Sequence, residues 1–200
     1  MSNLSDLLPS GGGQNIVDFT ASGTIASGKP VILNDNGTVS QVGTVPEALG
    51  SQTSFSSTTT TRIASCYDPD TGKTIIAYRG ASNYGYALVA TPASDNSITF
   101  GTPVTFLSGT LTEVALSYDT GQDKVLLVYS DGADGNKLKA ITGTVSGTSI
   151  SFSSSSQAEG NSSENIAVAY SPDSENHMVI YADGGNSDRG AARVITCLLY

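Results

Sequence analysis

Three segments of this chain are copies of one pattern, and this internal repeat constrains the fold more than any other feature. The copies are RIASCYDPDTGKTIIAYRG from Arg62, EVALSYDTGQDKVLLVYSD from Glu113 and NIAVAYSPDSENHMVIYAD from Asn165. Two tyrosines recur in every copy at spacings of 51 and then 52 residues: Tyr67, Tyr118 and Tyr170, and Tyr78, Tyr129 and Tyr181. A fixed period of this length is typical of stacked supersecondary units.

Each copy is expected to form four short antiparallel strands. In the first copy, Ile63–Tyr67 alternates large and small side chains, and Ile75–Tyr78 is a continuous apolar run after a turn rich in Asp, Pro and Gly. These patterns predict two strands that are packed on both faces. Third strands are expected at 86–91, 138–145 and 191–197, and weaker fourth strands at 98–106 and 150–156, with a break near Pro103.

The predicted fold is therefore all-β: a small N-terminal β module followed by four-stranded, β-propeller-like repeats over residues 47–200. Gly50–Phe55 aligns with Gly101–Phe106 and is expected to be an outer strand without the rest of its blade. Three units are fewer than the roughly four that a closed propeller needs. We expect either further repeats beyond Tyr200, or pairing of Gln52–Ser56 with Val194–Leu198 of a second copy.

The first 46 residues differ from the repeats. Residues 1–14 contain the glycine run Gly11–Gly13 and are expected to be a flexible tail. Residues 15–46 are expected to form a small β module, with a hairpin turn at Asn36-Gly37 between two alternating runs. So small a module buries little by itself, so we expect it to dock on another protein as an anchor.

The charge balance excludes several classes of partner. The chain has 9 basic and 18 acidic residues, a net charge of −9. Nucleic acid and anionic membranes attract clustered Lys and Arg, so neither is an expected partner. The sequence has no apolar run long enough to span a membrane and no recognisable secretory signal.

No cofactor or metal is expected from the sequence. Cys66 and Cys197 lie 131 residues apart; a disulfide between them stays open, but the favoured interpretation is two small buried side chains. His177 is the single histidine, and neither a CxxC motif nor a Cys/His cluster occurs along the chain. A zinc site is therefore not expected.

Carboxylates that follow the strands offer weak alternatives. Asp131 and Asp183 occupy matching positions after the second strand, where a pair of acids could hydrolyse a glycoside, and Arg79 follows the same strand in the first copy. Asp131 with Asp134, or Asp68 with Asp70, could bind Ca²⁺. Asp and Gly in such loops favour turns, so we expect structural roles, no catalytic residue and no enzyme.

Aromatic side chains in one loop are a candidate ligand-binding feature. Tyr84 and Tyr86 lie in a Gly-Ala-Ser-Asn-Tyr-Gly-Tyr sequence that is present only in the first copy. Aromatic rings on loops can stack on sugars, whereas the repeated tyrosines are explained by core packing.

The stretch SDLLPSGGGQNIVDFTASGTIASGKPVILNDNGTVSQV and the repeats after it resemble virion structural proteins of marine and cyanobacterial phages, of the tail-fibre or surface-displayed type. The resemblance implies a virion protein that is made in the host cytoplasm, released by lysis and anchored to other virion proteins through residues 1–46. It implies display of the repeats for attachment to a host-surface glycan or receptor, and homo-oligomerisation. Alternatives are a capsid decoration protein without receptor binding and, less favoured, a depolymerase or sialidase-like propeller hydrolase.

Overall fold

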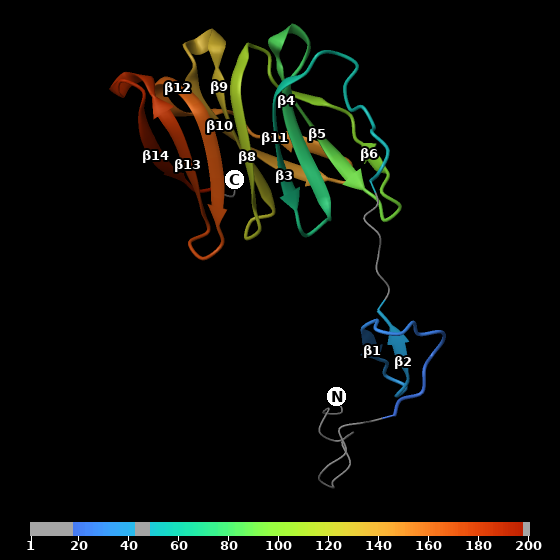
Figure 1. Cartoon of the computed structure of the whole chain (residues 1–200). Coiled ribbons are helices and arrows are strands. Elements are labelled where there is room, and N and C mark those ends of the chain that lie inside the picture. The colour runs from blue at the N-terminus through green and yellow to red at the C-terminus, as the bar shows by residue number, and fades with distance from the viewer. Residues whose placement is uncertain (1–17, 43–48, 198–200) are drawn as a thin grey trace. The chain divides into compact units, whose positions relative to one another are not determined.

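The computed structural model describes residues 18–42 and 49–197, and it is built from antiparallel β-sheets (Figure 1). Contacts divide the chain into two compact units, Met1–Ala48 and Leu49–Tyr200. The expected flexible tail, residues 1–14, lies outside the described residues, as do Leu198 and the last part of the expected anchor module. Within the described ranges, no helix is long and apolar enough to cross a membrane.

The first unit contains one small hairpin. Strands β1 (Val31–Leu33) and β2 (Val39–Gln41) pair antiparallel, and Gly37 in the connecting turn has a φ of 79°. Glycine tolerates this left-handed backbone without steric cost. The hairpin predicted at Asn36-Gly37 is confirmed, and the side chains of β1 are exposed.

The second unit contains three successive antiparallel three-stranded meanders, one for each copy of the sequence repeat (Figure 1). The first meander contains β3 (Thr61–Asp68), β4 (Lys73–Arg79) and β5 (Gly85–Pro92). The second contains β8 (Leu111–Asp119), β9 (Lys124–Asp131) and β10 (Lys137–Ser146), and the third contains β12 (Ser156–Ser171), β13 (Asn176–Asp183) and β14 (Arg189–Ile195). A short 3₁₀ turn joins the second and third strand of every meander: η2 (Ala81–Asn83), η3 (Gly132–Asp134) and η4 (Gly184–Asn186). We call the meanders the first, second and third repeat.

The fourth strand of the first two repeats is split. In the first repeat, β6 (Ile98–Phe100) and β7 (Val104–Leu107) both pair with β5, which confirms the break expected near Pro103. In the second repeat, β11 (Ser149–Phe152) and the first half of β12 pair with β10. The second half of β12 pairs with β13, so one continuous strand belongs to two repeats.

Gly50–Phe55 does not form the expected outer strand, because no described strand pairs with it through backbone hydrogen bonds. Its side chains nevertheless follow the repeat. Phe55 packs edge-on against Tyr78 at 5.1 Å between ring centroids, and Phe106 packs in the same way on Tyr129 at 5.4 Å. The sequence alignment of the two segments was therefore correct for packing and wrong for hydrogen bonding.

Apolar side chains pack between successive repeats. The first and second repeats share a cluster that includes Ile75, Ala77, Leu127 and Tyr129, and the second and third share one that includes Val128 and Val179. The second repeat is covered on both faces, and Phe55 and Phe100 pack on a smaller buried cluster of Tyr78, Leu88 and Ala90 on the other face of the first. The expected burial on both faces therefore holds for β4 but is wrong for β3 and for the third repeat, where apolar side chains are exposed: Ile63 and Tyr67 in β3, and Met178, Ile180 and Val194 in the third repeat.

Candidate functional site

A groove with an aromatic wall lies on the first repeat. Tyr86 on β5 stacks on Tyr78 of β4 with 5.8 Å between ring centroids, and the edge of Phe55 contacts Tyr78. These three rings, together with Ser56, Ser57 and Thr58, line a pocket of about 280 Å³. The pocket thus offers the half-buried rings of Phe55 and Tyr86 and several hydroxyl groups to one ligand, while Tyr78 supports these rings from below the surface.

A second pocket of about 380 Å³ shares Thr58 and Ala81 with the first and adds the side chain of Arg79. Arg79 Nε donates to Thr61 Oγ1 at 2.9 Å, and its Nη1 donates to the carbonyl of Leu111 at 3.3 Å. These bonds hold the guanidinium at the groove, where it can also attract an anionic group. We call the two pockets together the aromatic groove.

Of the two tyrosines that the sequence offered as a sugar-stacking feature, Tyr86 lines the aromatic groove and Tyr84 does not line either pocket. Tyr86 is half-buried in the groove wall, whereas Tyr84 follows turn η2 and is also half-buried, so neither ring projects freely from a loop tip. Burial, with the neighbouring Tyr86, raises the pKa of the Tyr78 hydroxyl. That hydroxyl is therefore a neutral hydrogen-bonding group at physiological pH.

Asp131 and Asp134, which the sequence offered as a weak alternative for a calcium site, are joined by a lysine side chain. Asp131 Oδ1 accepts from the backbone N–H of Ala133 and caps turn η3, and its Oδ2 binds Lys139 Nζ at 2.8 Å. Lys139 Nζ also lies 3.1 Å from Asp134 Oδ2, so an ammonium group already occupies the place between the carboxylates. Lys137 and Lys139 hydrogen-bond Asp134 and hold its pKa below its usual value.

Among the described residues, no hydrogen bond or ion pair joins Asp183 to Asp131. Strands β10 and β12 lie between β9 and β13, the strands that carry the two carboxylates. Asp183 Oδ1 accepts from the backbone N–H of Gly185 and caps turn η4. The repeated aspartates therefore serve as caps of equivalent turns, in agreement with the structural role expected from the sequence.

Asp68 also serves a turn. Its Oδ1 accepts from the backbone N–H groups of Asp70 and Thr71, and its Oδ2 accepts from the Thr71 hydroxyl. Burial raises the pKa of Asp68, but hydrogen bonds from Thr71, Tyr118 and the Asp70 backbone outweigh it, and the pKa is lowered overall. Both oxygens of Asp68 therefore already accept hydrogen bonds within the turn, so Asp68 does not offer a free carboxylate for a calcium site with Asp70.

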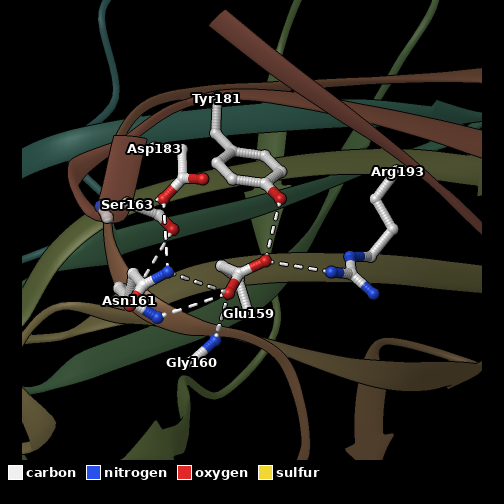
Figure 2. Close-up of polar contacts among 8 residues, drawn as sticks. Glu159, Gly160, Asn161, Ser163, Tyr181, Asp183 and Arg193 are labelled. Atoms are coloured by element: carbon white, nitrogen blue, oxygen red, sulfur yellow. Dashed lines mark hydrogen bonds and ion pairs between the residues drawn. The ribbon is translucent and has the colours of Figure 1, made fainter. Parts of the chain in front are cut away.

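A polar cluster in the third repeat was not found from the sequence (Figure 2). Glu159 Oε2 accepts from Arg193 Nη2 at 2.9 Å and from the Tyr181 hydroxyl at 3.2 Å, and Glu159 Oε1 accepts from the Gly160 backbone. Asn161 connects Glu159 to Asp183 through weaker contacts of 3.5 Å. No motif marks these residues, since the repeat does not conserve Glu159 or Arg193 in its other copies.

Although the sequence has no Cys/His cluster, the fold brings His177, Cys197 and Asp119 together. His177 Nε2 lies 3.3 Å from Cys197 Sγ and 3.6 Å from Asp119 Oδ2, and all three side chains are buried. Both cysteines are free, so the disulfide left open by the sequence does not form. As expected, Cys66 packs against the apolar cluster of the first two repeats and Cys197 is buried in that of the second and third; Cys197 also contacts His177.

A signal for this cluster was present in the repeat. Strand pairing places His177 at the position of Val125 in the second repeat, and Cys197 at the position of Val145. Two polar substitutions at apolar positions of a repeat indicate a local function or a local hydrogen-bond network.

No protein-family model matches the chain, and a search of curated proteins found no significant match.

Proposed function

We propose that this protein is a phage virion protein that attaches to a host-surface glycan through the aromatic groove of its first repeat. The observation that carries the binding part of the proposal is the groove itself, where the Tyr86 ring, stacked on the buried Tyr78, lines one pocket with Ser56–Thr58. The virion part is supported by the sequence resemblance, and residues 1–46 are proposed to be the anchor to other virion proteins.

Sugar rings suit this groove. Their apolar C–H faces pack on aromatic rings, and their hydroxyls exchange hydrogen bonds with serine and threonine side chains. The two pockets, of about 280 and 380 Å³, are in the lower part of the range of small-molecule sites. Arg79 adds one positive charge, so the proposal extends to glycans that carry carboxylate or sulfate groups.

We also propose that each repeat is a blade of a propeller-like fold. Three repeats of equivalent topology, whose cores form between successive sheets, support the interpretation of each repeat as a propeller-like blade. Binding is favoured over glycoside hydrolysis because Asp131 and Asp183 are both engaged as turn caps, and Asp131 is also paired with Lys139. Capsid decoration without receptor binding remains the alternative that the first experiment below distinguishes.

The test is binding of the full chain to an array of bacterial surface polysaccharides, followed by calorimetry with the best polysaccharide. We expect Tyr86→Ala to weaken binding at least about tenfold, the equivalent of about 1.4 kcal/mol. Tyr67→Ala is the matched control, because Tyr67 is exposed outside the groove and should not affect binding. Capsid decoration would be favoured by no binding to any polysaccharide, and a Tyr86→Ala variant that binds normally would exclude the groove.

The anchor is tested separately. Deletion of residues 1–46 should leave a folded repeat region that still binds glycan but is no longer incorporated into particles. Incorporation at the normal level would refute the anchoring role, whatever the outcome of the glycan experiment.

A further inference from the structure

Three potential metal ligands meet between the second and third repeats. Asp119 lies at the end of β8, His177 lies on β13, and Cys197 follows β14. The ligand atoms Asp119 Oδ2, His177 Nε2 and Cys197 Sγ lie within 4.8 Å of one another. Nε2 is 3.3 Å from Sγ and 3.6 Å from Oδ2, close to the separations between ligands of one tetrahedral ion whose bonds are about 2.0–2.3 Å long.

The Asp119 carboxylate is only half satisfied. Its side chain is fully buried, and Oδ1 accepts from the backbone N–H groups of Gly121 and Gln122. Oδ2 points toward His177, whose Nε2 lies 3.6 Å away, and in the described part of the chain Oδ2 has no hydrogen bond of ordinary length, although the Tyr170 hydroxyl also lies near this carboxylate. A buried carboxylate oxygen without a donor is costly, so its position next to two other ligand atoms requires an explanation.

The interface between the first and second repeats has an equivalent aspartate but no histidine or cysteine at the positions of His177 and Cys197. Asp68 is the equivalent of Asp119 between the first and second repeats, and its Oδ2 accepts from the Thr71 hydroxyl. Gln122 replaces Thr71 in the second repeat and supplies only its backbone N–H, to Oδ1. Val125 and Val145 occupy the positions of His177 and Cys197. The interface that lacks the threonine hydroxyl is therefore the one that has His177 and Cys197 beside the aspartate.

The histidine is held in the orientation of a ligand. Ser117 Oγ lies 2.6 Å from His177 Nδ1, so Nδ1 can keep its proton and donate it while Nε2 presents a lone pair toward Asp119 and Cys197. This is the usual outer contact of histidines that bind metals. The ring of Tyr170 packs against the His177 ring at 5.0 Å between centroids and restricts its rotation.

We propose that Asp119, His177 and Cys197 bind one divalent transition-metal ion of the zinc class at this junction. A thiolate, a carboxylate and a neutral imidazole around a divalent cation give a site with no net charge, which suits a buried position. Binding requires the Cys197 thiol to lose its proton to solvent as the sulfur–metal bond forms. Three protein ligands leave the fourth tetrahedral position to a water molecule.

The ion would tie the third repeat to the second. Asp119 comes from one repeat and His177 and Cys197 from the other, so metal binding adds a cross-link between them that does not depend on glycan binding. Because an ion that binds only the folded state raises stability, we expect zinc to raise the melting temperature of the metal-free chain.

The test is titration of the full, metal-free, reduced chain with Zn²⁺ and with Co²⁺ as a spectroscopic probe. We expect one equivalent of either ion to bind, with a thiolate-to-cobalt charge-transfer band and the visible bands of tetrahedral cobalt. Cys66→Ala is the matched control and should bind one equivalent, since Cys66 packs in a different, apolar cluster. Ser117→Ala should bind about 10–100-fold more weakly, as for other outer contacts of metal-bound histidine.

The decisive variant carries His177→Val and Cys197→Val together, because valine occupies both positions in the preceding repeat and should preserve folding. It should bind no metal and gain no thermal stability from zinc, with an unchanged circular dichroism spectrum. The proposal is overturned if the wild-type chain binds neither ion, if cobalt shows no thiolate band, or if the folded double variant binds like the wild type.

Discussion

Aspartate recurs at the ends of strands in the repeats, directly before a turn. The four examples are Asp68, Asp119, Asp131 and Asp183. Each accepts hydrogen bonds from the backbone N–H groups of the turn that follows its strand. The sequence predicted this role for Asp68, Asp131 and Asp183, because Asp next to Gly and Ser in a short connection favours a turn. It could not predict the partners of Glu159 or Asp119, since these come from distant segments that only the packing of repeats brings together.

Glu159 provides a prediction at the scale of a residue. A hydrogen bond from the Gly160 backbone lowers the pKa of Glu159, burial opposes this, and Arg193, Asn161 and Tyr181 lower it further. The folded state therefore favours the carboxylate. The stabilisation is complete above the ordinary glutamate pKa of 4.5 and is lost as the pH falls through the lower, folded-state value.

We expect Glu159→Gln to reduce the free energy of unfolding at pH 7 by about 1 kcal/mol and to flatten its dependence on pH below 4.5. Urea unfolding monitored between pH 3 and pH 7 measures both effects. Glu164→Gln, at an exposed position of the same strand, is the control and should leave the profile unchanged. A Glu159→Gln profile that follows the wild type would show that the cluster in Figure 2 does not contribute to stability.

At the scale of elements, the first hairpin of each repeat uses the same backbone with different residues. Gly72, Asp123 and Glu175 occupy equivalent positions and have φ values of 68°, 51° and 52°. Glycine adopts this left-handed conformation without strain, whereas a residue with a Cβ is strained by roughly 1 kcal/mol.

We therefore expect Glu175→Gly to stabilise the chain by up to about 1 kcal/mol, because it gives the third hairpin the residue that the first already has. Glu175→Ala removes the same carboxylate but keeps a Cβ, and it should not stabilise. Thermal unfolding of the two variants beside the wild type makes the comparison. Equal melting temperatures for the Gly and Ala variants would mean that backbone strain at this turn is negligible.

The element scale also shows where sequence patterns succeed and fail. Strand positions, hairpins and the break near Pro103 were predictable because apolar periodicity and turn residues act locally. Gly50–Phe55 was predicted as a strand because it resembles Gly101–Phe106, but a strand also needs a partner, and similarity of sequence cannot supply one. The aromatic groove was only partly predictable: Tyr86 was identified, but its stacking on Tyr78 beside Ser56–Thr58 depends on the fold.

At the scale of the whole repeat region, the outer face of the third repeat differs from the faces between repeats. Met178 and Ile180 of β13 are 52% and 44% exposed. Their equivalents in the first two repeats, Ile75 with Ala77 and Leu126 with Val128, are fully buried against the next repeat. The face of the third repeat therefore has the composition of an interface between repeats, and the side chain best suited to cover it is that of another repeat.

Sedimentation velocity of the full chain over a range of concentrations tests most directly whether the repeats are stackable blades with an uncovered interface. We expect the 20.4 kDa chain to self-associate with rising concentration, and Ile180→Lys to abolish association because it places a charge on the uncovered face. Thr144→Lys, at an exposed position of β10, is the control and should associate like the wild type. A chain that stays monomeric at every concentration, or an Ile180→Lys variant that associates as before, would contradict the stacking of blades through this face.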